Sequence, residues 1–332
     1  MAITSTPGPA EVSGIQVHRL DVPRLPFAEV AAFPVARDIE RILTRERVDM
    51  VHSHVSIVAP VALGGALAAQ RLRLPTVVTF HSFIPATRLL SGLTGLALGA
   101  ARWRAEMTAV SRRVAREVET FASGVRFTVL PNAIDTAYWT PASISRSDKQ
   151  VRLIFAGRLQ SKKRPLLLLR VLRELARVAA SYDWFLTVVG EGVLERSLRA
   201  GVRDLGMDHR VHFAGWVDAD RLREMLRTSD VFLSTAARES FGLAALEARA
   251  CGVPVVAVED SAVADFITHE VSGLLARSDD GFAAATARLV RDAELRTRLA
   301  EFNRRTAVPF DWARSIDAHE SIYASAAARA TR

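Results

Sequence analysis

Short runs of β-branched and aliphatic residues alternate with longer runs of helical periodicity along most of the chain. In the first half, the short apolar runs predict strands at Ile15–Leu20, Met50–His54, Thr76–Phe80, Met107–Val110 and Phe127–Leu130. The periodic runs between them predict helices near Pro34–Arg47, Val58–Arg71, Leu89–Arg104 and Ser111–Phe121. Strands that alternate with helices predict βαβ units and therefore a mostly parallel sheet.

A change of pattern divides the chain near its middle. Tyr138–Gln150 is polar, has no period and contains Pro141, so it predicts a linker. The alternation then restarts, with strands predicted at Val151–Ala156, Phe185–Val189, Val211–Phe213, Val231–Ser234, Pro254–Val258 and Gly273–Ala276. Helices are predicted near Pro165–Ala180, Leu194–Leu205, Arg221–Arg227, Phe241–Ala250, Gly281–Val290, Ala293–Arg304 and Asp311–Ala328. Two consecutive α/β units predict two Rossmann-like lobes. Ligands bind at the carboxyl ends of parallel strands, so the cleft between the lobes is the expected ligand site.

Composition agrees with two globular domains. The chain has 332 residues, of which 49% are hydrophobic and 24% charged, so it is too long for one core and too apolar for a disordered chain. The net charge of +8 is spread along the chain, with +4 up to Thr140 (15 basic minus 11 acidic) and +4 after it (29 minus 25). A spread charge argues against nucleic-acid binding. The only lysines are Lys149, Lys162 and Lys163.

Other features place the protein in the cytoplasm. Cys251 is the single cysteine, which excludes an internal disulfide, suits a reducing compartment and predicts a small buried side chain. Residues 1–14 have neither a basic nor an apolar region of a secretory signal and predict a flexible lead-in. The most apolar run, Leu89–Ala101, is too short to span a bilayer. It predicts a buried helix, with peripheral contact at the inner face of the membrane as the alternative.

A buried strand that ends at Gly157 leads into the first segment with candidate chemistry. Arg158 is expected at the carboxyl end of that strand, and Pro165 fits the first turn of the next helix. Arg158 and Lys163 therefore both lie between a strand end and a helix start. A forked guanidinium and a compact ammonium together suit a diphosphate, although their spacing equally allows two solvated loop cations.

Residues 231–256 predict a strand, a loop and the start of a helix. Backbone N–H groups of 241–243 would lie at the helix N-terminus, which attracts anions, and Gly242 would let a ligand approach closely. Glu239 precedes the helix and Glu247 lies in its second turn, and ionised carboxylates accept hydrogen bonds from sugar hydroxyls. The alternatives are a helix-start acid for Glu239 and a solvated acid for Glu247. The apolar neighbours of Glu247 argue against the latter.

Some motifs resemble metal or cofactor sites without meeting their requirements. Asp218 and Asp220 have the Asp-x-Asp spacing of a metal motif, but they precede a predicted helix and favour helix-start acids. The turn at 190–192 lacks the third glycine of a dinucleotide fingerprint, which disfavours a dehydrogenase. His52 and His54 share one face of a strand without further ligands at metal spacing, which favours packing or cleft lining.

Taken together, the motifs resemble those of the retaining GT-B glycosyltransferases of family four. The Glu-x7-Glu spacing in ESFGLAALE, followed by EARACGVPVV, resembles the family's donor-binding signature. Segments that agree in the same order are DMVHSH (49–54), VVTFHS (77–82), TAVS (108–111), VLPNAIDTAYW (129–139), FAGRLQSKKRP (155–165), VVGEG (188–192), VHFAGWV (211–217) and FDWARSIDAHESIY (310–323). The resemblance extends from about residue 15 to the end of the chain.

The resemblance implies transfer of a sugar, expected to be a hexose, from a nucleoside diphosphate donor to a hydroxyl acceptor with retention of configuration. The acceptor class stays open between a lipid-linked molecule, a small molecule and a glycan. No cofactor or metal is implied. Two residues are implied as catalytic, His81 near the reacting sugar and Glu239 on the sugar hydroxyls. The implied donor-binding residues are Arg158, Lys163, Gly190, Gly215, Trp216, Val217, Ser240, Phe241, Gly242, Leu243 and Glu247.

The resemblance also implies an α/β, GT-B-like architecture of two Rossmann-like lobes that face each other across a cleft. After the lead-in at 1–14, the expected parts are an acceptor-side lobe (15–140), a linker (141–150), a nucleotide-sugar lobe (151–308) and a helix (309–332) that returns to the first lobe.

The main departure from the family is at the start of the chain. The first predicted strand, Ile15–Leu20, resembles a later strand of the family's first lobe, so the glycine-rich opening units are expected to be missing. This motivates the alternative of a non-catalytic or partner-dependent glycosyltransferase-like protein. Smaller departures are Thr235-Ala236 for a Pro-Ser pair, Ser261–Asp265 for a Gly-Gly-x-x-Glu loop, and Arg164 for a glycine.

Overall fold

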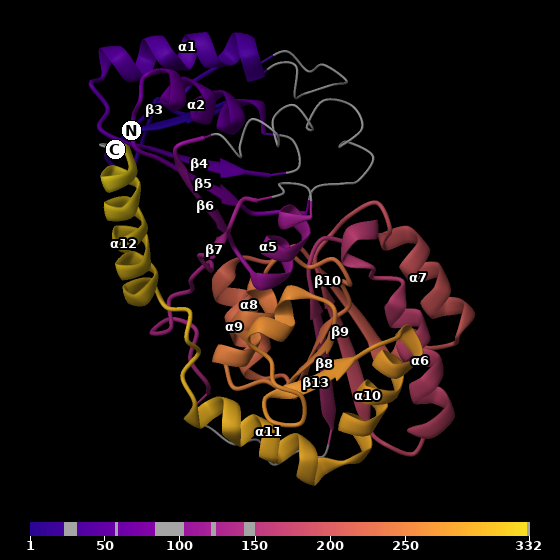
Figure 1. Ribbon diagram of the computed structural model, residues 1–332. Helices are drawn as coiled ribbons and strands as arrows, with labels where there is room; N and C mark the ends of the chain where they lie inside the picture. Colours follow the sequence, from indigo (N-terminus) through magenta and orange to yellow (C-terminus); the bar gives the residue numbers. More distant parts are fainter. Residues whose placement is uncertain (23–31, 57–58, 84–102, 121–123, 143–149, 331–332) are drawn as a thin grey trace. The chain divides into compact units, whose positions relative to one another are not determined.

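The structure is a computed structural model, which describes residues 1–22, 32–56, 59–83, 103–120, 124–142 and 150–330. The chain divides into two units, one made of Met1–Pro131 with Ser315–Arg332 and the other of Asn132–Arg314. The last helix, α12 (Trp312–Ala330), therefore begins in unit 2 and continues as part of unit 1 (Figure 1). The predicted return of the C-terminal helix to the first lobe is confirmed.

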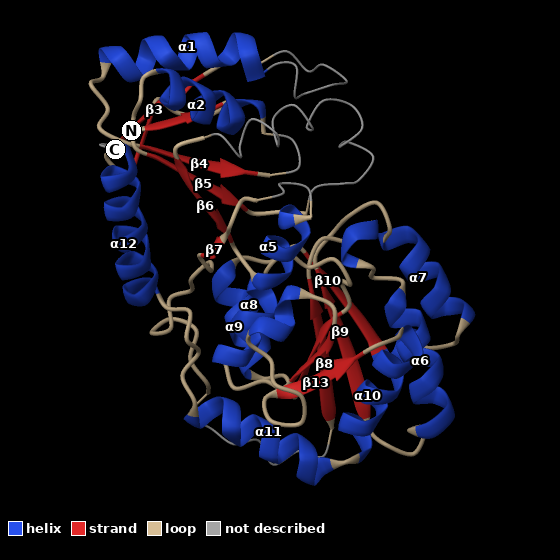
Figure 2. Ribbon diagram, in the orientation of Figure 1, coloured by secondary structure: helices blue, strands red, loops and turns tan. Residues whose placement is uncertain are grey.

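Unit 1 contains a small three-stranded sheet and a four-stranded parallel sheet among its described residues (Figure 2). In the small sheet, β3 pairs in parallel with β1 and antiparallel with β2. The larger sheet has the order β4-β5-β6-β7. The elements are β1 (Ala2–Thr4), β2 (Glu11–Val12), β3 (Ile15–Arg19), α1 (Ala32–Arg45), β4 (Val51–Val55), α2 (Pro60–Arg71), β5 (Thr76–Phe80), β6 (Ala105–Ala109), α5 (Arg112–Glu119) and β7 (Thr128–Val129).

Local sequence explains where the helices of unit 1 begin. Pro60 is the first residue of α2. At this position a backbone N–H would have no partner within the helix, so proline loses no hydrogen bond there. Ser111 caps α5, since its hydroxyl accepts a hydrogen bond from the Val114 N–H at 3.1 Å. One face of the four-stranded sheet packs its apolar side chains, which include Val55 and Val78, against α2.

Unit 2 is a six-stranded parallel sheet in the order β10-β9-β8-β11-β12-β13, with helices on both sides (Figure 2). This is the strand order of a dinucleotide-binding Rossmann sheet, 3-2-1-4-5-6. The strands are β8 (Val151–Ala156), β9 (Trp184–Val189), β10 (Val211–Gly215), β11 (Val231–Ser234), β12 (Val255–Val258) and β13 (Gly273–Ala276). The helices are η2 (Ser161–Lys163), α6 (Leu167–Val178), α7 (Glu195–Asp204), η3 (Asp208–Arg210), α8 (Ala219–Arg227), α9 (Leu243–Ala250), η4 (Ala262–Asp265), α10 (Asp279–Arg291) and α11 (Ala293–Arg305).

Near-continuous apolar runs make the core of unit 2. Leu153, Leu186 and Leu233 come from adjacent strands and are fully buried together with Leu168 and Leu172 of α6. Such runs are expected for parallel strands that are covered on both faces. The hydrophobic pattern therefore determines both the strands and the helices that cover them.

Two boundaries differ from the sequence prediction. The flexible lead-in predicted over 1–14 is wrong, because Ala2–Thr4 and Glu11–Val12 pair with β3. The two units divide at Pro131 and Asn132, ahead of the predicted linker. The reason is that the following residues bond within unit 2: the Ile134 N–H donates to the Phe310 carbonyl at 3.0 Å.

The membrane alternative rests on Leu89–Ala101, which lies outside the described residues, as does most of the helix predicted at Leu89–Arg104. Among the helices that the structure describes, none has the length and apolarity that a membrane-spanning segment requires.

Candidate active site

The site in unit 2 is built where the strand order of its sheet reverses. β8 and β11 are neighbours, and the chain leaves their carboxyl ends toward opposite sides of the sheet. Such a switch point leaves room for a ligand between the two connecting loops. A pocket here is lined by residues of both strand ends and of the two loops, among them Ala156, Lys163, Ser234, Thr235, Glu239 and Gly242.

Lys163 and Glu239 form an ion pair at this pocket. The Lys163 ammonium nitrogen lies 2.5 Å from a carboxylate oxygen of Glu239, although the two residues are 76 positions apart. The Thr235 hydroxyl donates to the Lys163 carbonyl at 2.5 Å, which ties the loop after β8 to the loop after β11. Glu239 is only 9% exposed. The tertiary structure thus joins a cation and a carboxylate from the two candidate segments.

Arg158 follows β8 and is exposed at the same edge of the sheet. Within the described ranges its guanidinium has no hydrogen-bond or ion-pair partner. A guanidinium without an internal partner remains available to an anionic ligand.

Arg164 is a structural residue that the sequence analysis noted only as a departure. Its φ of +51° lies in the left-handed region, which glycine adopts most readily and which agrees with the glycine that the family resemblance implies at this position. The Arg164 guanidinium donates to both carboxylate oxygens of Asp279, at the start of α10, at 2.7 Å each. This contact, from one guanidinium nitrogen to both carboxylate oxygens, holds the loop that presents Lys163.

The start of α9 provides backbone donors. Gly242 precedes the helix with φ of +93°, and a Cβ atom there would lie 2.7 Å from the Val263 side chain, so only glycine fits. In the described part of the chain, the N–H groups of 241–243 have no acceptor. The Phe241 ring is buried against Phe266 and Phe310. Phe241 can therefore contribute only its backbone to a ligand, and the helix starts two residues later than predicted.

Glu247 is half-buried on α9. Burial raises the pKa of its carboxyl to about 7. The solvated acid, which was the alternative for Glu247, is therefore the poorer description of this residue. A hydrogen-bond donor such as a hydroxyl would favour its ionised form.

The turn after β9 and the turn after β10 are joined by backbone contacts. The Gly190 N–H donates to the Gly215 carbonyl at 2.7 Å. A Cβ atom on Gly190 would lie 2.2 Å from the Gly157 carbonyl oxygen, so the close approach requires glycine. The Glu191 carboxylate accepts from the Trp216 N–H at 3.2 Å, and the Trp216 ring is 73% exposed.

Glu191 is a residue of this region that the sequence analysis did not assign. The sequence feature that could have pointed to Glu191 is the pair of glycines that flank it, which both have positive φ in the structure. Its contact orders the segment that contains Trp216 and Val217, which the family resemblance places at the base.

The look-alike motifs have structural roles. The Asp218 carboxylate caps α8 by accepting from the Arg221 N–H at 2.8 Å, and Asp220 accepts from the Tyr138 hydroxyl at 2.7 Å. No cluster of metal-ligating side chains occurs among residues that the structure describes.

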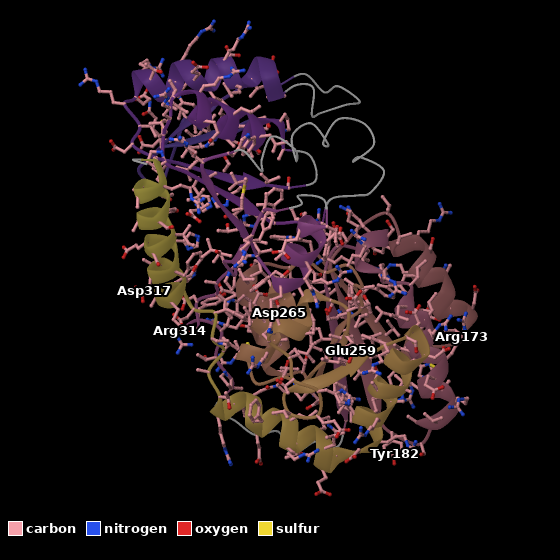
Figure 3. All side chains as sticks on the ribbon, viewed as in Figure 1. Arg173, Tyr182, Glu259, Asp265, Arg314 and Asp317 are labelled. Carbon is pink, nitrogen blue, oxygen red and sulfur yellow. The ribbon has the colours of Figure 1, made fainter. Side chains whose placement is uncertain are left out.

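Cys251 is buried, as predicted. Asp265 ends η4 (Figure 3), whose first residue, Ala262, donates its N–H to the Glu239 carbonyl.

His81 belongs to unit 1, where it directly follows β5. Its N–H donates to the Val55 carbonyl at 2.8 Å, and its ring is half-buried beside His54. Burial, followed by the neighbouring imidazoles of His54 and His319, lowers the pKa of His81 to about 4, so this ring is neutral at pH 7.

The comparisons with known proteins agree with these two units. Residues 2–138 match the family Glycosyltransferase Family 4, and residues 140–306 match Glycosyl transferases group 1. The chain belongs to the group 1, family 4 glycosyltransferases. It is 31% identical to a D-inositol 3-phosphate glycosyltransferase of Pseudarthrobacter chlorophenolicus, over 82% of this chain and 70% of the relative. A protein of the same name from Saccharomonospora viridis is 32% identical, over 84% and 70%.

Solved structures identify the GT-B fold of this glycosyltransferase. The Anabaena protein HepE, solved in complex with UDP and glucose, superposes with a TM-score of 0.73 at 20% identity and covers 94% of this chain and 87% of its own. The sucrose-phosphate synthase of Thermosynechococcus elongatus has a TM-score of 0.74 at 18% identity, with coverage of 95% and 84%. The predicted family and fold class are confirmed.

Proposed function

We propose that this glycosyltransferase moves a hexose from a nucleoside diphosphate sugar to a hydroxyl acceptor, with retention of configuration and without a metal ion. The observation that carries the proposal is the Lys163–Glu239 pair at the switch point of a Rossmann sheet. Arg158, which has no ion-pair partner among the described residues, follows β8 at the same edge of the sheet. A cation for phosphate and a carboxylate for hydroxyls are thereby adjacent, which matches the two halves of a nucleotide sugar.

In this proposal, different residues of unit 2 bind different parts of the donor. Lys163 and Arg158 neutralise the diphosphate, whose negative charge grows as the sugar leaves, so fixed cations stabilise the transition state. Glu239 accepts hydrogen bonds from the sugar hydroxyls. The unpaired N–H groups of 241–243 donate to the donor, and Glu247 accepts from the ribose. The two cations supply positive charge that a metal ion supplies in other enzymes.

Donor and acceptor are proposed from the relatives. HepE was solved with UDP and glucose, so UDP-glucose is the first donor to test. The curated relatives are named D-inositol 3-phosphate glycosyltransferases, so a phosphorylated polyol is the first acceptor to test, ahead of lipid-linked and glycan acceptors. His81 is assigned to the reacting side of the sugar in this proposal.

A donor panel with two variants tests the proposal. Transfer or slow hydrolysis of at least one of UDP-, GDP- and ADP-linked hexoses is expected, with an α-linked product from an α-linked donor. Glu239→Ala and Arg158→Ala are each expected to lower kcat/KM roughly 10²–10³-fold, because each removes a contact to the transition state. Glu259→Ala, at an exposed carboxylate paired with Arg277, is the matched control and keeps full activity (Figure 3).

Three results would contradict parts of this proposal. Absence of turnover with every donor would favour the non-catalytic alternative. Loss of activity in EDTA that is restored by Mg²⁺ would refute metal independence. An inverted product would refute retention.

A further inference from the structure

One face of the four-stranded sheet of unit 1 carries polar side chains where parallel sheets ordinarily carry apolar ones. The strand register places six polar side chains on this face, namely His52, His54, Thr79, His81, Glu106 and Thr108. Helix α12 covers them, since Ser325 and Arg329 both donate to Glu106, at 2.8 and 2.9 Å. The proposed function uses only His81 from this face.

His54 and His81 share one hydrogen bond, with 2.9 Å between Nδ1 of His54 and Nε2 of His81. Burial lowers the pKa of both rings, so both are neutral at pH 7. When His54 donates the shared proton, His81 keeps its own proton on Nδ1. When His81 donates, its Nδ1 is bare. The tautomer of His54 therefore decides whether Nδ1 of His81 is a donor or an acceptor.

A chain of hydrogen bonds fixes the tautomer of His52, next to this pair. The Thr108 hydroxyl lies 3.4 Å from the Val78 carbonyl and 2.5 Å from the Thr79 hydroxyl. With the Thr108 proton assigned to the carbonyl, the Thr108 oxygen accepts from Thr79. Thr79 in turn accepts from Nε2–H of His52 at 2.6 Å. Nδ1 of His52 is then bare and accepts from the Tyr323 hydroxyl at 2.9 Å. Burial raises the pKa of Tyr323, which keeps this hydroxyl protonated.

The fixed ring of His52 supports the ring of His54. Their centroids are 4.1 Å apart with a 32° tilt, so the two imidazoles stack. A ring that is bonded at both nitrogens cannot turn without breaking two hydrogen bonds. Tyr323 of α12 is thereby connected to His81 through two intervening histidines.

We propose that His54 is a positioning residue for His81, and that α12 holds the pair through Tyr323 and His52. The proposal rests on the proposed function, in which His81 is assigned to the reacting side of the donor sugar. His54 fixes the orientation of the His81 ring and which nitrogen carries its proton. The C-terminal helix is then part of the machinery that sets the reaction geometry, in addition to packing on the sheet.

Kinetics of two substitutions at one position test the positioning role. His54→Ala removes the bond to His81 and is expected to lower kcat roughly 10- to 100-fold with little change in the donor KM, because misplacement of one contact affects the transition state most. His54→Asn is expected to recover most of the rate, since the Asn amide can place either its Nδ2 donor or its Oδ1 acceptor near the position of Nδ1 and so keep the bond to His81. His209→Ala, at an exposed histidine of unit 2, is the control.

The outcomes of these kinetics distinguish failure of the positioning role of His54 from failure of the proposed function. An active His54→Ala enzyme beside an inactive His81→Ala enzyme would overturn the positioning role and leave the proposed function intact. A wild-type protein without turnover on any donor would contradict the proposed function. An equal loss in His54→Ala and His54→Asn would also overturn the positioning role, because a retained bond should restore the rate.

A second measurement needs no turnover. The chain has eight histidines, so their ring nitrogens can be assigned by NMR in ¹⁵N-labelled protein. We expect the His52 proton on Nε2 in the wild type. In Tyr323→Phe the Thr79 hydroxyl still accepts this proton, so the tautomer is kept, and the signals of the unbonded His52 Nδ1 and of His81 should shift. Tyr182→Phe, at an exposed tyrosine of unit 2 (Figure 3), should leave both signals unchanged. A His52 proton on Nδ1 would refute the proposed connection from Tyr323 to His81. A His81 signal that is the same in the wild type and in Tyr323→Phe would refute it as well.

Discussion

The two parallel sheets of this glycosyltransferase are stabilised in different ways. In unit 2 both faces are apolar, with Leu153, Leu186 and Leu233 on one face and Ile154 and Phe232 on the other, all at most 2% exposed. In unit 1 one face is apolar against α2, and the other carries histidines, threonines and a glutamate against α12.

The difference shows how a polar sheet face is stabilised. Each polar atom of such a face requires a partner, because an unpaired buried donor or acceptor destabilises the fold. In unit 1 the partners come from the neighbouring strand two residues further along and from α12. In unit 2 the polar groups lie at the strand ends, where Lys163 and Glu239 form an ion pair. The sheet itself is stabilised by packing of apolar side chains.

If apolar packing stabilises unit 2, a cavity in its sheet should have the largest effect. Leu186→Ala, at a fully buried position, is expected to lower the free energy of unfolding of unit 2 by about 2–5 kcal/mol. Urea denaturation followed by the fluorescence of buried Trp184 measures it. Leu166→Ala, at a 39% exposed leucine, is the control and should change less than about 0.5 kcal/mol. Equal effects would contradict the comparison.

If hydrogen bonds stabilise the polar face of unit 1, removal of one hydroxyl should have an intermediate effect. Thr108→Val keeps the shape but leaves the buried Thr79 hydroxyl without its acceptor, which should lower the stability of unit 1 by about 1–3 kcal/mol. Thr286→Val in unit 2 removes an equally buried hydroxyl that bonds only the helix carbonyl of Phe282, and should cost less. Amide hydrogen exchange in each unit reports the two effects separately.

Donor binding in unit 2 should weaken when the pH falls through 7. Burial raises the pKa of Glu247 to about 7, and the ribose hydroxyls bind its ionised form. Between pH 7.5 and pH 6 the affinity for a nucleoside diphosphate should fall by less than about tenfold. Calorimetric titration with UDP measures it, and Glu247→Gln should bind weakly at both pH values. An unchanged affinity in the wild type would argue against a role for Glu247.

The smallest expected effect is a pH dependence of stability with opposite signs in the two units. Burial lowers the pKa of His52 to about 3 and of His81 to about 4, so the unfolded chain binds more protons there below pH 6.5. Acidification from pH 7 to pH 6 should therefore destabilise unit 1 by on the order of 0.5 kcal/mol per histidine. Glu247 has its pKa raised, so the folded state binds more protons there between its ordinary value and 7.

Unit 2 should consequently gain stability from Glu247 over the same pH change, by on the order of 1 kcal/mol. Hydrogen exchange of peptides from β4–β5 and from β8–β9 at the two pH values compares the units directly. His52→Gln should reduce the loss in unit 1. A loss of the same size in both units would contradict the assignment of the effect to these residues.

The sequence by itself determined the family and the order and type of most of the described elements. Apolar runs of strand length between periodic runs specify parallel α/β units, because burial on both faces of a sheet requires continuous apolar strands. The strand Thr76–Phe80 was predicted at its observed bounds, and Arg158, Lys163, Glu239 and Glu247 were singled out from their places at strand ends and a helix start. Local pattern suffices for these features because they depend on neighbouring residues.

Only the tertiary structure decided which distant side chains meet. The ion pair between Lys163 and Glu239, the support of Trp216 by Glu191, and the contact of Tyr323 with His52 join residues 25 to 271 positions apart. The strands at 2–4 and 11–12 also depended on a partner, since so short a segment forms a strand only when β3 supplies its hydrogen bonds. Spacing along the chain carries no record of such contacts, because strand order and helix packing determine them.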